Sequence, residues 1–430
     1  MTDRIVYPFR GIHYDTAKTH DISLLIAPPY DVISPEMQGE LYARDAHNFV
    51  RLELPRPDEA DTETENRYTR AADTLRSWLA EGVLVREDAP ALYVVETEFS
   101  LAGRTGRRRG VFALVRIPEE GEHYVLAHEA TFSGPKADRF QLMMATQAMI
   151  SPVLAMCEDA EAEVLRALQS VARPPEAEAA DDGGARHRLW IVRDQSLINA
   201  VRAAVGGGPI YLLDGHHRFE TARAYRDAVR RTHPTAPRDA GFNFALMLLA
   251  SARDEGMRIL PSHRLVSGLR REGVEWVASR LREYFHVHPR PRPDWDRVDD
   301  LLQEERARGR HVFASYCADD SFVVLAAKEE LLPVSDSPVD QLDVTVLHRE
   351  LLDLTTDLGD VTITYAADPR AAAEAVSRGE CDFAFFLRPT TVEQVIAVAR
   401  AGELMPHKST YFYPKAPAGL VISDASPEPI

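Results

Sequence analysis

The sequence predicts an α/β (α+β) protein built from two domains. Strand-like and helix-like segments alternate over most of the 430 residues, a pattern typical of sheets covered by helices. This length suits two domains, and the 45% of hydrophobic residues supply side chains for a core in each. The proline-rich residues 289–296 are the best boundary. We therefore expect one domain over 1–288 and a smaller α/β domain over 297–430.

The N-terminal residues 1–57 are irregular and rich in proline. Pro28 and Pro29 hold the backbone extended and restrict the residues before them. The sequence thus predicts that Tyr30 and Asp31, which follow directly, are presented in a fixed direction.

A helix and a hairpin are predicted next. Apolar residues recur on one helical face over 68–81, and Gly82 suits the position after the helix end. Residues 91–99 and 110–117 are rich in Val, Tyr and Phe and predict two paired strands. Arginines crowd the turn between them: Arg104, Arg107, Arg108 and Arg109. We interpret this turn as solvated, with an anion-binding loop as the alternative.

An irregular segment in the middle of the chain precedes further predicted helices and strands. Residues 173–186 combine proline, alanine and acidic residues, and predict an exposed loop or a flexible linker inside the first domain. A helix is predicted from about 219 to 231, and the unbroken apolar run 242–250 is typical of a central strand covered on both faces. Later strands are predicted at 311–317, 322–327, 361–365 and 382–387, and later helices at 341–353, 370–378 and 392–401.

Composition indicates a cytoplasmic protein without nucleic-acid or membrane partners. The net charge of −17 repels nucleic-acid phosphates. No apolar stretch reaches the length of a membrane span, and the first residues lack the apolar segment of a signal peptide. The three cysteines (Cys157, Cys317 and Cys381) are far apart, so neither a disulfide framework nor a structural zinc site is indicated.

The segment from Asp214 to Arg218 has the features of a phosphate cradle. Gly215 permits a tight turn close to a ligand. His216 and His217 open the helix, where N–H groups without helical partners favour an anion. Arg218 can add a bidentate contact. Alternatively, Asp214 caps the helix and the histidines hydrogen-bond within the core.

This segment, together with residues 219–222 (FETA), resembles the GHxR-type motif of the ParB/sulfiredoxin superfamily. The chain also resembles a bacterial and archaeal family of unknown function (domain of unknown function one thousand and fifteen). The matching stretches are 27–34 (APPYDVIS), 128–139 (HEATFSGPKADR), 260–264 (LPSHR) and 408–415 (KSTYFYPK). The resemblance implies a ParB/sulfiredoxin-like N-terminal domain with insertions, whose turn binds nucleotide or product phosphates. The free-serine kinases, which phosphorylate L-serine with ATP or ADP, are the nearest characterised relatives that it implies.

Residues 128–139 offer a second group of polar side chains. Lys136 and Arg139, near a glycine-proline turn, suit phosphate binding. Glu129 and Asp138 are possible ligands for Mg²⁺ bound together with ATP or ADP. The same stretch supplies two further candidate contacts, His128 to phosphate and Ser133 to substrate. The alternative is a capped helix start with solvated charges.

Three further sets of residues complete the candidates. Asp31 suits the carboxylate that accepts a proton from a hydroxyl nucleophile, with Tyr30 as a substrate contact; alternatively Asp31 forms an Asx-turn before the next helix. The C-terminal segment with Lys408, Ser409 and Thr410 can return to the first domain's site, or form an aromatic strand on the core. The pair His263 and Arg264 is a further possible substrate contact.

Together these features predict a phosphotransferase acting between a nucleotide and a small hydroxylated metabolite, with serine as the first candidate. Asp31, Glu129 and His216 are the candidate catalytic residues. Two alternatives stay open, a phosphoserine phosphatase-type hydrolase and a non-catalytic nucleotide-sensing regulator. A weaker one is a metal-dependent hydrolase using His128, His216 and His217, which predicts a tightly bound transition metal.

Overall fold

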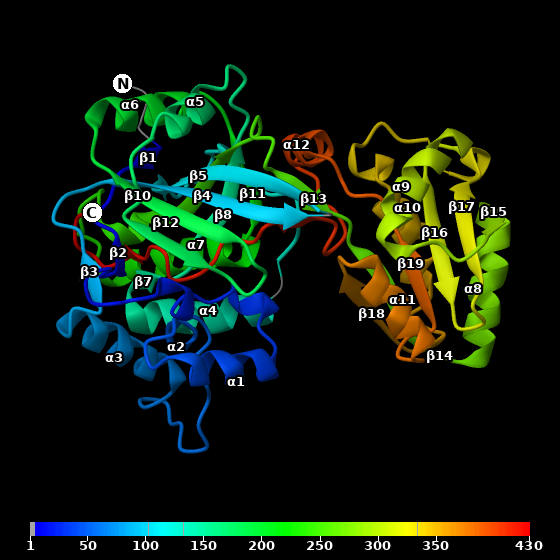
Figure 1. The fold of residues 1–430 in the computed structure, drawn as a ribbon, viewed down its shortest axis with the longest axis horizontal. Coiled ribbons are helices and arrows are strands. Elements are labelled where there is room, and N and C mark those ends of the chain that lie inside the picture. The colour runs from blue at the N-terminus through cyan, green and yellow to red at the C-terminus, as the bar shows by residue number, and fades with distance from the viewer. Residues whose placement is uncertain (1–4, 102, 132, 333) are drawn as a thin grey trace. The chain divides into compact units, whose positions relative to one another are not determined.

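The computed structural model describes residues 5–101, 103–131, 133–332 and 334–430, and Figure 1 shows its ribbon. The chain divides into two compact units. Unit 1 consists of Met1–Ala127, Thr131–Arg258 and Pro414–Ile430, and unit 2 of His128–Ala130 and Ile259–Tyr413. Each unit combines a sheet with helices, which confirms the α+β class.

The division lies at residue 258 and not at the proline-rich residues 289–296. Strand β15 (Phe285–Arg290) pairs with β17 (Phe322–Ala327) over its whole length, so Pro289 belongs to the sheet of unit 2. Among the described strands, β15 forms the edge of that sheet, where proline is tolerated because its missing N–H is not needed for a further strand. Pro289 thus lies in an edge strand, whereas Pro291 and Pro293 lie between β15 and the 3-10 turn that begins at Trp295, inside unit 2.

The main sheet of unit 1 is mixed. Over the described residues its strands follow the order β6-β11-β8-β12-β5-β4-β10-β9, with β1 beside β5. Most neighbours are antiparallel, whereas β12 runs parallel to β8 and β6 to β11. The strands are β1 (Val6–Tyr7), β4 (Leu92–Leu101), β5 (Arg104–Arg116), β6 (Val125–Leu126), β8 (Val153–Cys157), β9 (Ala177–Ala180), β10 (Arg186–Val192), β11 (Ile210–Asp214) and β12 (Phe244–Ser251). Two short ladders lie outside it, β2 (Ile12–Tyr14) with β3 (Leu84–Arg86) and β7 (Ala148–Met149) with β21 (Ser423–Asp424).

Helices cover both sides of this sheet. They are α1 (Pro35–Arg44), α2 (Val50–Glu53), α3 (Arg67–Ala80), α4 (Ser133–Thr146), α5 (Glu163–Gln169), α6 (Gln195–Val205) and α7 (His216–Thr232), with 3-10 turns η1 (Ile22–Leu24), η2 (Tyr30–Val32) and η3 (Gly241–Asn243). Figure 1 shows α5 and α6 on one side of the sheet and α4 on the other. Helix α7 contacts α4, β8 and β12, and therefore lies on the α4 side.

Local sequence explains several of these elements. The Asn66 side chain accepts hydrogen bonds from the N–H groups of Tyr68 and Thr69 at 3.0 and 3.3 Å, and the hydroxyl of Thr69 accepts one from the N–H of Asn66, which forms a capping box at the start of α3. Gly82 follows the helix at a φ of +69°. Every residue of β12 is buried. The predicted helix, the β4–β5 hairpin and the central strand are confirmed.

Two predictions for unit 1 need correction. Residues 173–186 are mostly exposed, as predicted, but they contain the strand β9, which pairs with β10 at the edge of the sheet, and are not a flexible linker. The arginine-rich segment is not a solvated turn, since Arg107, Arg108 and Arg109 all belong to β5 and pair with β4. Arg107 is exposed, but Arg108 is only 2% exposed.

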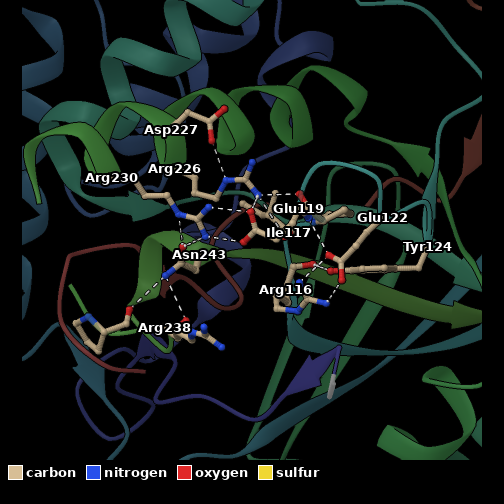
Figure 2. Close-up of polar contacts among 12 residues, drawn as sticks. Arg116, Ile117, Glu119, Glu122, Tyr124, Arg226, Asp227, Arg230, Arg238 and Asn243 are labelled. Atoms are coloured by element: carbon tan, nitrogen blue, oxygen red, sulfur yellow. Dashed lines mark hydrogen bonds and ion pairs between the residues drawn. The ribbon is translucent and has the colours of Figure 1, made fainter. Parts of the chain in front are cut away.

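The second half of α7 is fixed by arginines to the loop that follows β5. Figure 2 shows this network, in which Arg226 donates to the main-chain carbonyl of Ile117 at 3.2 Å. Arg230 donates to the carboxylate of Glu119 at 2.8 and 2.9 Å, and to the side-chain oxygen of Asn243 at 2.6 and 3.0 Å. These contacts hold the helix in place, and with it the turn at its N-terminus.

Unit 2 is built on an antiparallel sheet with the order β15-β17-β16-β19-β14-β18. Its other strands are β14 (His263–Leu269), β16 (Val312–Cys317), β18 (Gly359–Ala366) and β19 (Phe383–Phe386), and β13 (Arg258–Leu260) pairs separately with β20 (Tyr411–Tyr413). Its helices are α8 (Arg271–Tyr284), α9 (Val298–Glu304), α10 (Asp343–Glu350), α11 (Pro369–Ser377) and α12 (Val392–Arg400), with 3-10 turns η4 (Trp295–Arg297), η5 (Glu305–Arg308), η6 (Glu329–Leu331), η7 (Val339–Gln341) and η8 (Leu352–Leu354). Every element predicted after residue 297 is present, with ends shifted slightly.

The core of unit 2 centres on Trp295, which stacks on Phe386 with ring centroids 5.4 Å apart. Of the helices in the described residues, none has both the length and the apolar character needed to cross a membrane.

Candidate functional site

The turn between β11 and α7 has the predicted form of strand, glycine and helix start. Gly215 occupies the N-cap position with φ +91° and ψ 30°, a conformation that L side chains rarely adopt. A Cβ at this position would lie 2.8 Å from Nε of Arg218. The alternative that Asp214 caps α7 is not what the structure shows, because Gly215 is the N-cap and no side chain caps it.

Two cations share the carboxylate of Asp214. Arg218 donates to it from Nη2 at 2.6 Å, and Nζ of Lys415 forms a second ion pair with the other oxygen. Arg218 also donates to the main-chain carbonyl of Pro152, and its residue is only 7% exposed. Burial opposes the charge of Arg218, but Asp214 and other carboxylates hold its pKa above the ordinary value. Arg218 is therefore charged, and its hydrogen bonds hold the turn in place.

A second group of contacts joins α2, η2 and α4 beside this turn. Glu53 is fully buried, and its carboxylate accepts hydrogen bonds from the N–H of Tyr30 at 3.0 Å and from the hydroxyl of Ser151. Arg139 donates to the main-chain carbonyl of Glu53 at 2.6 Å, and its guanidinium lies 4.3 Å from the centre of the Tyr30 ring. Burial raises the pKa of Tyr30 to about 12. Asp31 is exposed, and close enough to Arg218 for its charge to stabilise the guanidinium.

The carboxylate of Asp138 is hydrogen-bonded to several neighbouring side chains. It accepts hydrogen bonds from Arg67 at 2.6 Å, from the hydroxyl of Tyr68 at 2.8 Å and from Nε of Arg139 at 2.8 Å. Burial opposes its ionisation, but these cations hold the pKa of Asp138 below the ordinary value. Lys136 lies half-buried on the same helix.

The two predicted Mg²⁺ ligands belong to different units of the chain. Asp138 belongs to unit 1 and Glu129 to unit 2, and within the described ranges no three His, Cys, Asp or Glu side chains form a group that could hold a metal. Mg²⁺ therefore stays a prediction. Ser133 begins α4, but its side chain lies outside the part of the chain that the structure describes.

A small cavity of about 40 Å³ adjoins both groups of contacts in unit 1. Its polar lining consists of Glu53, Arg139, Ser151, Arg218 and Thr221, and its apolar lining of Leu142, Met143, Ala148, Met149 and Ile150. The start of α7, the end of α2 and helix α4 thus meet at one place, which we call the α7 site.

In unit 2, His128 and Glu129 contact the C-terminal segment. His128 Nε2 lies 3.1 Å from the hydroxyl of Thr410. The carboxylate of Glu129 accepts hydrogen bonds from the main-chain N–H and the hydroxyl of Thr410, at 3.3 and 3.2 Å. Burial raises the pKa of Glu129, and the nearby His407 and Lys408 oppose that shift only in part.

His263 and Arg264 are buried and hold the neighbouring chain. Arg264 is 1% exposed and donates to the main-chain carbonyls of His407 and Lys408 at 3.3 and 3.2 Å. The Nδ1 atom of His263 accepts a hydrogen bond from the N–H of Leu387 at 3.3 Å. Burial, with a contribution from Arg264, lowers the pKa of His263 to about 3.

A cavity of about 330 Å³ in unit 2 lies where two of the predicted stretches meet. Ser262 and Arg264 come from the first stretch and Ser409 from the second. The rest of the wall is formed by Asp299, Asp300, Gln303, Arg306, Leu342, Asp343, Val344, Leu387, Arg388, Pro389, Thr390, Thr391 and Gln394.

The structure therefore separates the predicted site residues into two sets. Unit 1 holds Tyr30, Asp31, Lys136, Asp138, Arg139, Asp214, Gly215, His216, His217 and Arg218, and unit 2 holds His128, Glu129, His263, Arg264, Lys408, Ser409 and Thr410. Sequence reasoning missed Glu53, Ser151 and Lys415, and named Arg108 only in the alternative of an anion-binding loop. Glu53 had a signal, since it is a lone carboxylate between the apolar residues Leu52 and Leu54.

Comparison with known proteins establishes the family. A family model described as "Protein of unknown function (DUF1015)" matches residues 6–345. The chain belongs to the DUF1015 family. This confirms the predicted resemblance to that family of unknown function. No curated protein matches the chain.

Several solved structures share distant similarity with this DUF1015 chain. A variant of free serine kinase in complex with AMP is 14% identical, with 74% of this chain and 92% of that chain covered and a TM-score of 0.40. Another variant of free serine kinase, in complex with ADP, is 14% identical, with 74% of this chain and 92% of that chain covered and a TM-score of 0.39. A conserved hypothetical protein from Pyrococcus furiosus is 14% identical over 74% and 95%, with a TM-score of 0.38.

Proposed function

We propose that this DUF1015 protein is a phosphotransferase that moves a phosphoryl group between a nucleotide and a small hydroxylated metabolite at the α7 site. The observation that carries this proposal is the convergence of cations and carboxylates from distant segments at the start of α7. Arg139, Arg218 and Lys415 meet Glu53 and Asp214 there. Phosphoryl transfer relies on such positioning and electrostatic stabilisation.

Two cations and a helix N-terminus at the turn favour an anion. Arg218 and Lys415 each pair with Asp214, and Asp31 and Glu53 also act on the charge of Arg218. The N-terminus of α7 adds N–H groups and a dipole that attract anions. A phosphate would lie against Gly215 and His216.

Asp31 is the carboxylate that we assign as the proton acceptor. It is exposed, unlike Glu53, and its segment is held by the hydrogen bond from the N–H of Tyr30 to Glu53. Glu53 is thus a positioning residue, because it fixes the turn that presents Asp31. A general base of this kind contributes about 100- to 10,000-fold to the rate.

Mg²⁺ would neutralise phosphate charge at such a site and is commonly bound by one or two carboxylates together with the phosphates. Asp138 is less suited to this role, because its oxygens already accept several hydrogen bonds.

The test is phosphoryl transfer from ATP or ADP to L-serine and other hydroxylated metabolites, followed by ³¹P NMR, for the wild type and for Asp31→Asn. We expect transfer in the wild type, a loss of about 100-fold or more in Asp31→Asn, and unchanged nucleotide affinity. Asp73→Asn is the matched control, since Asp73 is an exposed carboxylate on α3.

Each other outcome identifies a different function. Nucleotide binding without transfer to any acceptor would contradict the kinase proposal and favour the nucleotide-sensing regulator. Release of phosphate from phosphoserine, lost in Asp31→Asn, would favour the phosphatase-type hydrolase. Equal transfer by the wild type and Asp31→Asn would remove Asp31 from the mechanism.

A further inference from the structure

Arg108 carries a buried charge, and in the described chain its two terminal nitrogens have no hydrogen-bond acceptor. The residue is 2% exposed, and neither Nη1 nor Nη2 has a partner. Its neighbours on β5 are both paired, Arg107 with Glu98 at 2.9 Å and Arg109 with Glu96 at 2.7 Å. A buried guanidinium without an acceptor is strongly unfavourable and therefore uncommon.

Strand geometry places Arg108 on the α7 side of the sheet. Arg109 donates to the main-chain carbonyl of Leu168 in α5 at 3.0 Å. Successive side chains of a strand point to opposite faces, so Arg108 points away from α5. Figure 1 shows α5 and α4 on opposite sides of this sheet, and α7 packs on the α4 side.

The carboxylates nearest to Arg108 are engaged elsewhere. Asp254 accepts hydrogen bonds from the N–H groups of Arg109 and Gly256 at 2.8 and 2.7 Å. Asp214 forms ion pairs with Arg218 and Lys415. Burial lowers the pKa of Arg108 to about 10, although both carboxylates oppose the shift, so the guanidinium is charged at neutral pH.

The main chain around Arg108 is held rigidly. A Cβ at Gly256 would lie 1.8 Å from the carbonyl oxygen of Arg107, so the loop after β12 rests directly on β5. The hydrogen bond from the N–H of Arg109 to Asp254 ties the same two segments. On the other side, β5 pairs with β4. The main chain that carries Arg108 is thus ordered before any ligand binds, which lowers the entropy lost on binding.

We propose that Arg108 is an anion-binding residue on the α7 side of the main sheet, and that its Nη1 and Nη2 atoms bind a phosphate group. The inference rests on the proposed function, because it supplies a residue for the same phosphate-dependent chemistry. The charge of a phosphate would provide the acceptor that Arg108 lacks. Both nitrogens are covered by protein atoms, so the neighbouring side chains must move to admit the anion.

The test compares the wild type with Arg108→Met, which keeps most of the length of the side chain and removes its charge. Melting temperature and Kd are measured with inorganic phosphate, ADP and phosphoserine. We expect the unliganded variant to melt at the same temperature as the wild type or roughly 2–4 °C higher, because an unpaired buried charge is removed. We also expect Kd for the phosphate ligand to rise about tenfold or more.

Control variants separate charge from fold. Arg107→Met alters an exposed neighbour on the same strand and should change neither quantity. Arg108→Lys keeps the charge without the fork of two nitrogens, and should retain part of the affinity. The three ligands distinguish sources of the phosphate, since a response to inorganic phosphate alone indicates a simple anion site.

Two results would overturn the inference. A clear fall in the melting temperature of Arg108→Met would show that Arg108 is a structural residue with a partner in solution. Equal Kd values in the wild type and Arg108→Met would show that Arg108 does not contact the anion, while the proposed function stands. A wild type that binds none of the three ligands, with or without Mg²⁺, would overturn both.

Discussion

Replacing Gly215 by alanine tests whether the turn before α7 is built around this glycine. The left-handed conformation at φ +91° disfavours any residue with a Cβ, by roughly 1–2 kcal/mol. The added Cβ would also lie 2.8–3.0 Å from the guanidinium of Arg218. If Arg218 moves away, its hydrogen bond to Asp214 is lost, which costs about 1.5–3 kcal/mol more. The expected total is roughly 2.5–5 kcal/mol.

Urea unfolding measures this difference directly. Gly208→Ala is the matched control, because nothing lies within 4 Å of a Cβ at Gly208, and it should change the free energy of unfolding by less than about 0.5 kcal/mol. In an Arg218→Met background, Gly215→Ala should lose the hydrogen-bond contribution and cost only roughly 1–2 kcal/mol. A Gly215→Ala protein as stable as the control would refute the reasoning.

Three further predictions concern single side chains. Lys415→Met should lower the free energy of unfolding by about 1–3 kcal/mol, because Asp214 loses one of its two cations; urea unfolding checks this, and an unchanged value would contradict the pairing. Glu53→Gln should reduce phosphoryl transfer more than nucleotide binding, since it disturbs the turn with Asp31; equal losses would argue against a positioning role. The folded pKa of His263 is lowered from 6.5 to about 3, so between these values only the unfolded chain takes up the proton. Neutral His263 therefore contributes to the free energy of unfolding above pH 6.5, and this contribution is lost as pH falls. The free energy of unfolding should be lower by about 2 kcal/mol at pH 5. His263→Gln should show a smaller loss between pH 7 and pH 5.

The sequence predicts the fold well where the signal is local. The apolar periodicity of α3, the alternation of β4 and β5 and the apolar run of β12 are each contained within one element. Helix propensity and side-chain burial act there over a few residues, so the pattern alone is sufficient. The glycine turn at Gly215 belongs to the same class.

The site is less predictable because its contacts join distant residues. Lys415 reaches Asp214 across 201 positions, and Glu53 contacts Ser151 across 98. Arg108 was hidden for another reason, because its neighbours Arg107 and Arg109 are both charged and made the segment resemble a solvated turn. Only the pairing of β4 with β5 shows that the three arginines alternate between faces.

Neighbourhood in sequence also misled the prediction. Residues 128–139 form one motif, yet the chain enters unit 2 at His128 and leaves it after Ala130, so Glu129 and Lys136 belong to different units. These three residues of unit 2 are held by a single β-bridge, in which Glu129 pairs with Met405. Composition gives no sign of so short an excursion.

The place of residues 414–430 in unit 1 has a consequence for synthesis of the protein. Lys415 pairs with Asp214, and Ile422 exchanges main-chain hydrogen bonds with Ile12 at 2.8 and 2.9 Å. A ribosome makes these partners some 200 and 410 residues apart in the chain (415 minus 214, and 422 minus 12). Unit 1 therefore begins first but can close only after unit 2 has emerged. A polypeptide stalled before residue 414 would lack Lys415, so Asp214 would lose one of its two ion pairs. We expect chaperones to bind such an incomplete unit 1.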